Sequence, residues 1–352
     1  MEHRVYSLPK KRMGELFGLI SSSRQLFLPM EKGGQFQFSR VDEHTDLEGV
    51  SLDRLLTAGS AKELFFPQTQ QIAAFRRRGK EIELTSAETL TSAFVAFGVR
   101  ACDARSLEVL DRAFLGTPRD TMYEEKRSKG TVVTLACNEP EETCFCSVFS
   151  IDAASPKGDV ETWIAGDTLY WRPGSEKGAE LTQELDALLD PCSEEEPEGL
   201  IQLKQQIRSI IGKLPLGRLS LEQFRPEALQ ELFDDPAWQK LSEPCIGCGT
   251  CTFVCPTCQC FDIRDFDTGE GVQRFRCWDS CMYSDFTTMA HGNPRTSQVE
   301  RFRQRFMHKL VYYPANHDGL YSCAGCGRCV SKCPNSMNMV KVMKTLGGAQ
   351  HV

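Results

Sequence analysis

The sequence has no long hydrophobic run, no excess of basic charge and none of the common nucleotide-binding motifs. Nothing in its 352 residues approaches the roughly 18 consecutive apolar residues that span a membrane. The formal net charge of −7 gives no electrostatic case for binding nucleic acid. The motifs G-x-G-x-x-G, P-loop and H-E-x-x-H are missing, so the sequence itself supports no nicotinamide or flavin site. We therefore expect neither a membrane span nor a nucleic-acid partner.

The first twenty residues also lack the features of a secretory signal. They contain basic residues and a short apolar run, but Glu15 interrupts that run and no small-residue cleavage site follows. We expect an early helix in this segment, and a cytoplasmic protein.

Cysteine is the residue type that is abundant, with 17 in the chain. In a small secreted protein this number would indicate disulfides, but this chain is large and has no recognisable export signal. Closely spaced cysteines in a cytoplasmic protein are more typical of metal ligands. Twelve of them lie between residues 245 and 333. The others are Cys102, Cys137, Cys144, Cys146 and Cys192.

Up to about residue 190 the pattern is mixed α/β. Apolar runs rich in β-formers predict strands at 92–99 and 131–137. Asp103 is expected to cap a helix between them, and 161–174 resembles a hairpin. The acidic, proline- and glycine-containing segment 190–199 is the best candidate for a domain boundary.

The strongest motif occurs twice. C-x2-C-x2-C-x3-C-P is the bacterial ferredoxin pattern, in which three thiolates hold one [4Fe–4S] cluster and the fourth binds the other cluster. Short spacers let three sulfurs converge, and the longer step with its proline directs the fourth cysteine away. We therefore assign one cluster to Cys245, Cys248, Cys251 and Cys333. The other cluster is assigned to Cys255, Cys323, Cys326 and Cys329. Zinc bound by C-x2-C pairs is the alternative.

The connection between the two runs, 256–322, is long and contains a segment with helical spacing, 299–310. It resembles the α-helical ferredoxins of succinate dehydrogenase and heterodisulfide reductase subunits. The arginines of 299–310 fall mostly opposite its apolar face, where they form a solvated face or else serve docking or cluster tuning.

These patterns together predict an α+β fold in three parts. A mixed α/β domain is expected over 1–190, with a possible extra metal site. A helical linker is expected over 191–240, since Ile207, Ile210 and Ile211 share helical spacing. An α-helical, ferredoxin-like domain with two [4Fe–4S] clusters is expected over 241–352.

The remaining cysteines form two groups of four and one single residue. Cys102 and Cys137 follow the predicted strands closely and are expected at one end of a sheet, beside Cys144 and Cys146. The second group is Cys258, Cys260, Cys277 and Cys281. Each group is a candidate for a third [4Fe–4S] cluster or a zinc site, and unligated packing in a core is the alternative. Cys192 is expected to be unligated.

Several segments occur together in an order that resembles one family. They are GVRACDARSLEVLDRAF, LACNEPEETCFC, CPTCQCFD, RCWDSC and GCGRCVSKCP. This combination is similar to the 4Fe–4S dicluster subunits that include the beta subunit of sulfhydrogenases and an iron–sulfur subunit of anaerobic sulfite reductase. The iron–sulfur partner of flavin oxidoreductases linked to heterodisulfide reductase belongs there too. The match covers roughly residue 90 to the end.

The resemblance implies an electron-transfer subunit of an oxidoreductase complex in anaerobic metabolism. Such a subunit relays single electrons between the FAD of an NAD(P)H-linked flavoprotein partner and another redox module, which is part of a hydrogenase, a sulfite reductase, a heterodisulfide reductase or a similar enzyme. FAD is expected on the partner and not on this chain. The resemblance also supports Cys102, Cys137, Cys144, Cys146, Cys258, Cys260 and Cys281 as ligands, whereas Cys277 is not a clear part of the shared pattern.

This chain is therefore expected to be non-catalytic. A structural or adaptor subunit, held together by zinc or clusters and without electron transfer, is the alternative. A third possibility is an enzyme with a substrate at an incompletely ligated extra centre.

Iron analysis of anaerobically purified protein tests the number of clusters. About eight irons per chain would limit the protein to two cubanes, and about twelve would require a third. A colourless, zinc-loaded preparation would contradict the electron relay.

Overall fold

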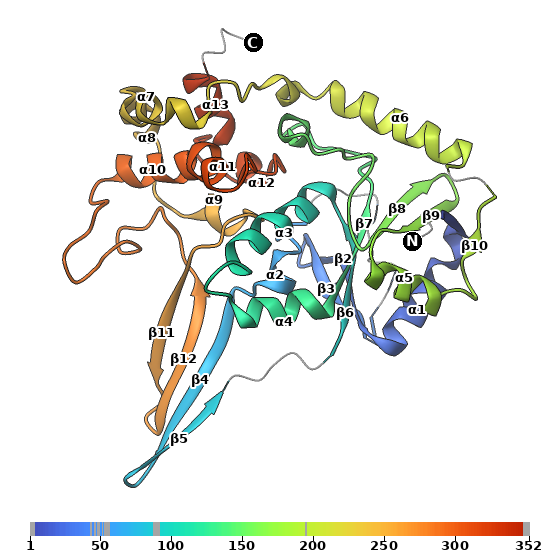
Figure 1. Ribbon diagram of the computed structural model, residues 1–352, viewed down its shortest axis with the longest axis horizontal. Helices are drawn as coiled ribbons and strands as arrows, with labels where there is room; N and C mark the ends of the chain where they lie inside the picture. The colour runs from blue at the N-terminus through green and yellow to red at the C-terminus, as the bar shows by residue number, and fades with distance from the viewer. Residues whose placement is uncertain are drawn as a thin grey trace.

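The computed structural model describes residues 4–42, 44–45, 47, 50, 52, 57–86, 92–193 and 196–347. Its elements form a large mixed sheet, a smaller projecting sheet and a helical region near the C-terminus (Figure 1). No helix among these residues is both long and apolar enough to cross a membrane.

The large sheet has eight strands in the order β10-β1-β9-β8-β7-β6-β2-β3. Its central strands β2, β6, β7 and β8 pair in parallel, and the outer strands pair antiparallel. In chain order the strands are β1 (Tyr6–Pro9), β2 (Gln25–Lys32), β3 (Gln35–Arg40), β6 (Phe94–Val99), β7 (Gly130–Leu135), β8 (Val160–Ala165), β9 (Thr168–Pro173) and β10 (Asp190–Pro191).

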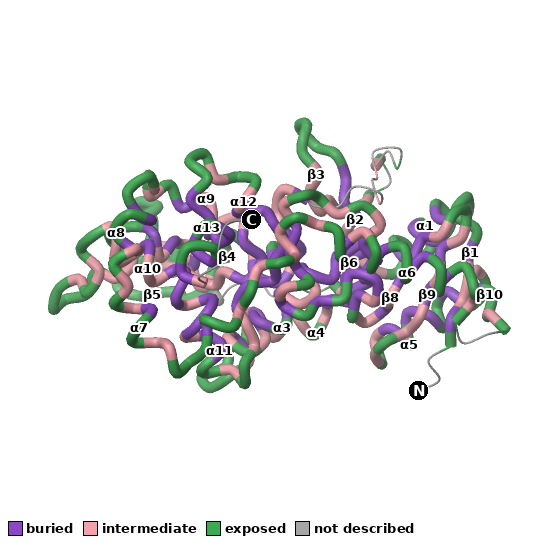
Figure 2. The backbone as a smooth tube through the Cα atoms, turned by 90° about the horizontal axis from the view of Figure 1, so that it is seen from above, coloured by how far each residue is buried: buried purple, intermediate pink, exposed green. Residues whose placement is uncertain are grey.

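Helices cover both faces of this sheet, which is why its middle strands are continuously apolar. Every residue of β6 and β7 is buried. On one face, α1 (Met13–Ser23) and α5 (Glu176–Glu184) pack into a core with the strands. On the other lie α2 (Lys62–Phe65), α3 (Ala101–Phe114) and α4 (Thr121–Lys129). In Figure 2 the buried backbone runs through the middle of the molecule.

The mixed α/β prediction for the N-terminal part is confirmed, including both strands and the β8–β9 hairpin. The predicted cap at Asp103 is wrong. The helix begins earlier, at Ala101 after Arg100, and Asp103 lies inside its first turn. Its carboxylate forms an ion pair with Arg328 instead of accepting from the helix backbone.

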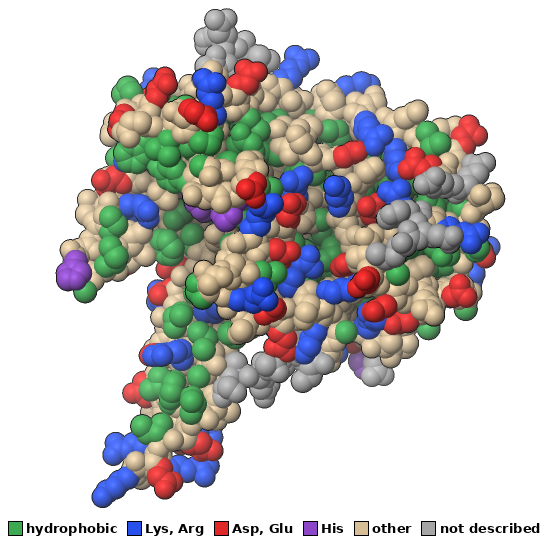
Figure 3. Space-filling model, in the orientation of Figure 1, with side chains coloured by type: hydrophobic (Ala, Val, Ile, Leu, Met, Phe, Trp, Pro, Cys, Tyr) green, Lys and Arg blue, Asp and Glu red, His purple; other side chains and the backbone are tan. Residues whose placement is uncertain are grey.

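The second sheet is antiparallel and has the order β11-β12-β4-β5. Its strands are β4 (Thr69–Arg78), β5 (Glu81–Ser86), β11 (Phe261–Asp267) and β12 (Gly271–Trp278). It projects from the body as an arm with apolar side chains along its visible face and charges at its tip (Figure 3). Ile82 of β5 is 75% exposed. The connection between the cysteine runs therefore contains a hairpin as well as helices, and that hairpin pairs with strands of the N-terminal part.

The C-terminal region is built from short helices around one core. The α-helices are α6 (Glu198–Gly212), α7 (Leu229–Asp234), α8 (Ala237–Ser242), α9 (Thr250–Phe253), α10 (Gln298–Met307), α11 (Tyr313–Asn316), α12 (Arg328–Ser331) and α13 (Met339–Leu346). A π-helical turn, His308–Tyr312, continues α10, and short 3-10 turns lie at Lys10–Arg12, Cys146–Phe149, Pro215–Arg218 and Pro226–Ala228. Since α6 packs over Trp163 of β8 in this same core, the two parts of the chain share it.

A buried ion pair also joins the two parts. Arg328 of α12 donates to both carboxylate oxygens of Asp103 in α3, at 2.5 and 2.7 Å. The side chains are only 3% and 2% exposed. Arg328 also donates to the carbonyl oxygen of Thr57 at 3.0 Å. A bidentate guanidinium–carboxylate pair is strongly directional, so it fixes the position of the second cysteine run against α3.

We expect Asp103→Asn to lower the free energy of unfolding by about 3–5 kcal/mol, because Arg328 then remains buried without its counter-charge. The exposed pair Asp152–Arg208 serves as the control. Asp152→Asn should cost no more than about 1 kcal/mol. Anaerobic urea unfolding followed by circular dichroism measures both, and equal losses in the two variants would contradict the assignment.

His308 gives an acid-sensitive contribution to stability. Burial, then Lys309, His317 and Arg295, lower the pKa of His308 to about 4. The folded pKa is below that of the unfolded chain, so the folded state binds fewer protons between about pH 6.5 and 4. His308 therefore does not make the free energy of unfolding depend on pH above about pH 6.5, and that free energy falls as the pH drops from about 6.5 to about 4. His308→Gln should remove up to about 3 kcal/mol of the loss between pH 7 and 4; an unchanged acid dependence in unfolding curves would refute this.

Candidate iron–sulfur centres

The first set of cysteines lines one pocket at the surface. Its members are Cys245, Cys248, Cys251 and Cys333. Pro334, Met282 and Met337 complete the walls with apolar surface. The backbone N–H of Met337 donates to the sulfur of Cys333 at 3.2 Å, which is the kind of bond that stabilises a thiolate. Cys333, from the second run, thus lies with three cysteines of the first.

This first set has an exposed side. Cys248 is exposed, and the neighbouring Ile246 is 65% exposed. A hydrogen bond with the Thr250 hydroxyl lowers the pKa of Cys248. The exposed thiol of this set is therefore one whose pKa is lowered.

The second set is buried. It consists of Cys255, Cys323, Cys326 and Cys329. Burial raises the pKa of Cys326 to about 12, with further increases from Cys255 and Cys329 and an opposing effect of Arg328. Burial and then Cys329 raise the pKa of Cys323, and Cys255 adds to the effect. Cys255, the last cysteine of the first run, therefore lies beside the cysteines of the second run. Cys333 thus lies with the first run and Cys255 with the second, as the spacing predicts. The assignment of these cysteines as cluster ligands stays a prediction.

The third set is formed by Cys102, Cys137, Cys144 and Cys146, all of them buried. Cys102 lies in the first turn of α3, Cys137 follows β7, and the other two lie in the loop before and at the start of a 3-10 turn. Burial raises the pKa of Cys137 to about 12 and that of Cys146 to about 11. Cys144 and Cys137 act on each other electrostatically, as do Cys102 and Cys146. The fold thus brings together the four cysteines that the sequence places at one end of the sheet.

The third set is packed directly against the second. The backbone N–H of Phe145 donates to the carbonyl oxygen of Gly325 at 2.8 Å, and the sulfur of Cys144 lies 4.0 Å from the carbonyl oxygen of Cys326. A Cβ at Gly325 would lie 2.4 Å from the oxygen of Phe145, and one at Gly327 would lie 2.6 Å from the oxygen of Thr143. Both glycines also have positive φ. Only glycine permits this close approach of the two loops.

Three of the four remaining candidates lie together, and we call them the trio: Cys258, Cys260 and Cys281. The thiols of Cys260 and Cys281 influence each other's pKa, and so do those of Cys258 and Cys255 of the second set. The backbone N–H of Cys258 also donates to the carbonyl oxygen of Cys255 at 3.4 Å. Cys277 does not join them. It lies in β12 opposite Asp262, and its pKa is raised by burial and affected by Arg264, Asp262 and Asp279 rather than by another thiol. Cys192 is also apart, beside the edge strand β10.

Buried cations surround these thiols, and most were not found from the sequence. Lys62, 2% exposed, donates to the carbonyl oxygen of Cys258 at 3.1 Å. Lys309, equally buried, donates to Thr257 and to the carbonyl oxygen of Ser322 at 2.9 and 3.0 Å. Burial lowers the pKa of Lys62 to about 8, against the opposing effect of Cys258 and Cys255. Helical spacing places Lys309 on the apolar face of 299–310. A charged residue at such a position suggests that the apolar face is interrupted there, so the sequence did not indicate a buried lysine beside the cysteines.

These features fit anionic clusters held by thiolates. In the described residues, the Nε and Nη1 atoms of Arg305 and the hydroxyls of Thr143 and Ser322 are buried without a hydrogen-bond partner. Sulfides and thiolates of a cluster accept such bonds. No group of three His, Cys, Asp or Glu side chains in this part of the chain could hold a single metal ion. A cubane sets a different requirement, because its four thiolates bind four different irons.

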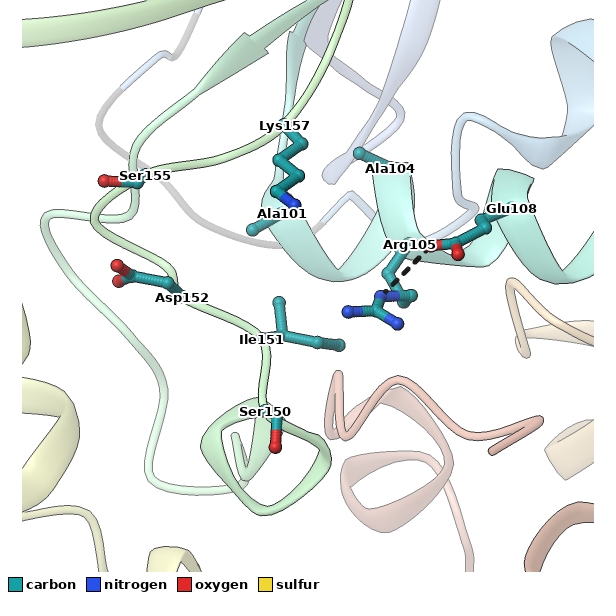
Figure 4. Close-up of a pocket in the computed structure, with 9 residues that line it drawn as sticks. All are labelled: Ala101, Ala104, Arg105, Glu108, Ser150, Ile151, Asp152, Ser155 and Lys157. Carbon is teal, nitrogen blue, oxygen red and sulfur yellow. Dashed lines mark ion pairs between the residues drawn. The ribbon is translucent and has the colours of Figure 1, made fainter. Parts of the chain in front are cut away.

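A polar pocket of about 240 Å³ lies at the start of α3 (Figure 4). Arg105, Asp152 and Lys157 line it, with Lys157 pointing inward. Arg105 is paired with Glu108, and Asp152 is paired with Arg208. The pocket is therefore largely self-neutralised, and none of the cysteines lines it.

Comparison with known proteins agrees with the cysteine pattern. Residues 244–337 match the family described as the 4Fe-4S dicluster domain. The chain is also 29% identical over 342 residues to sulfhydrogenase 2 subunit beta of Pyrococcus furiosus, which covers 97% of each chain. These findings confirm the resemblance to the dicluster iron–sulfur subunits. Most of residues 1–90 are included in this similarity, because it leaves out only about 3% of the chain.

If the third set holds a [4Fe–4S] cluster, replacing Cys137 by serine should lower the iron content from about twelve to about eight atoms per chain, because the third set loses one ligand. Cys192→Ser is the matched control and should leave the content unchanged. Iron and acid-labile sulfide analysis measures both variants. Undiminished iron in the Cys137→Ser protein would contradict Cys137 as a required ligand, and a wild-type content of about eight atoms would rule out a third cluster.

Proposed function

We propose that this chain, which contains a 4Fe–4S dicluster domain and resembles a sulfhydrogenase beta subunit over nearly its whole length, is an electron-transfer subunit of an oxidoreductase complex. It relays single electrons between the FAD of an NAD(P)H-linked flavoprotein and another redox subunit. The observation that carries the proposal is the placing of three cysteine sets side by side in one core.

The contacts between the sets define an order. Cys144 of the third set adjoins Cys326 of the second. Cys329 of the second set and Cys251 of the first act on each other electrostatically. Clusters in the three sets would form a row from the buried third set to the exposed first set. [4Fe–4S] clusters supply one-electron steps, and a row of neighbouring clusters supports transfer through the protein.

The residues of this chain hold the clusters, exclude water and supply counter-charge. The second and third sets are buried, which slows access of water and oxygen. Lys62, Arg305 and Lys309 place positive charge among the thiols. No substrate-transforming residue is required, so we propose that the subunit itself is non-catalytic. Catalysis then belongs to the other subunits of a cytoplasmic complex.

We also propose that the C-terminal region has an α-helical ferredoxin-type core. A short helix follows the second cysteine of each run and contains the third: α9, after Gly249, contains Cys251, and α12, after Gly327, contains Cys329. These two helices contact each other. Helix α10 belongs to the same core, where Arg305 donates to the carbonyl oxygen of Cys251. This pseudo-symmetric arrangement supports an α-helical ferredoxin-type core, to which the projecting hairpin of β11 and β12 is an addition.

Anaerobic purification from the native source with its bound partners tests the relay. We expect a brown complex that contains a flavoprotein, and NAD(P)H should bleach the iron–sulfur absorbance of this chain and produce the EPR signals of reduced [4Fe–4S] clusters. Cys248→Ser should slow this reduction, because it alters the exposed end of the row, whereas Cys192→Ser should not. A complex whose clusters stay oxidised while its flavin turns over would contradict the relay, and zinc in place of iron would favour a structural role.

A further inference from the structure

Arg305 lies where the first and second cysteine sets meet. It is in α10, 2% exposed, and its Nη2 donates to the carbonyl oxygen of Cys251 at 3.1 Å. Its charge acts on Cys251 and Cys245 of the first set and on Cys255 and Cys329 of the second. No other position in α10 combines full burial with a positive charge, so Arg305 is the cation of this helix that both sets share.

The hydrogen bonding of Arg305 is incomplete. Its Nε and Nη1 atoms are buried without a partner among the described residues. The ring of Phe306 lies 4.6 Å from its guanidinium carbon and offers no oxygen acceptor. A buried guanidinium with two unused donors is strongly destabilising unless an anionic acceptor is bound beside it. The charge of Arg305 is influenced by thiols of both sets, and the thiolates and sulfides of clusters bound there would supply such acceptors.

We infer that Arg305 is a positioning residue of the relay that bridges the first and second centres, donating hydrogen bonds toward both and raising both reduction potentials together. This inference rests on the proposed function, because it requires clusters at both sets. Reduction adds a negative charge to a cluster, and a fixed buried cation stabilises that charge. A cation shared by the two centres shifts both potentials in the same direction.

The other arginines of α10 provide a matched control. Arg303 donates to the carbonyl oxygen of Phe233 at 3.1 Å and stacks over the ring of that residue. It carries the same charge on the same helix, but no thiol is among the groups that Arg303 contacts in the described structure. Arg303→Gln therefore controls for general effects of removing an arginine from α10.

The test is an EPR-monitored redox titration of the anaerobically purified chain with its clusters. Arg305→Gln removes the charge but keeps amide donors, and Arg305→Lys keeps the charge. We expect Arg305→Gln to disfavour the reduced form at least tenfold at both centres, about 59 mV more negative for a one-electron couple. Arg305→Lys should shift both potentials less than Arg305→Gln does, and Arg303→Gln should leave them unchanged.

The outcomes separate the inference from the function on which it rests. Wild-type protein without [4Fe–4S] signals would refute the proposed function. Wild-type signals with potentials that Arg305→Gln leaves unchanged, or shifts at one centre only, would refute the bridging role alone. Loss of iron from Arg305→Gln but not from Arg305→Lys supports the role of the charge. Loss of iron from both variants would show a structural role and overturn the inference.

Discussion

The structure depends on placing many thiols and several cations in one water-excluded core. Thiolates are costly to bury alone, as the raised pKa values of Cys137, Cys146 and Cys326 show. Buried lysines and arginines are equally costly without counter-charge. A buried thiolate and a buried cation stabilise each other when they lie side by side. Thiolates that bind a cluster would be stabilised by its irons and would also accept hydrogen bonds from the cations. The fold is thus arranged to bring opposite charges from distant parts of the chain to the same place.

This constraint explains why the N-terminal part and the dicluster domain are joined by buried contacts. Asp103 of α3 pairs with Arg328 of the second cysteine run, and Lys62 reaches Cys258. The loop with Phe145 packs so closely on Gly325 that no side chain fits between them. The dicluster domain therefore obtains counter-charge and packing from the α/β part, and the third set of cysteines lies at that contact. A two-cluster ferredoxin alone would leave these charges unmatched.

Local patterns in the sequence predicted what is determined locally. The two C-x2-C-x2-C-x3-C-P runs define their own loop geometry, and the apolar runs at 92–99 and 131–137 became the buried strands β6 and β7. Features fixed by tertiary contacts were missed. The β11–β12 hairpin pairs with β4, which is far away in the sequence, so no local sequence pattern predicted this sheet. The arginines of 299–310 were expected either to form a solvated face or to serve docking or cluster tuning, and helical spacing alone did not show that Arg305 is the buried one. Cys277 was grouped with Cys258, Cys260 and Cys281 because they lie close together in the sequence, but its position in strand β12 separates it from the trio.

The central claim is that the three cysteine sets hold three cubanes in a row. X-ray diffraction from anaerobic crystals at the iron absorption edge tests it most directly. The account predicts three compact peaks of anomalous density, each enclosed by one set, with the peak of the second set between the other two. Anomalous density absent from the third set, or a peak at any set that disappears below the zinc edge, would contradict it.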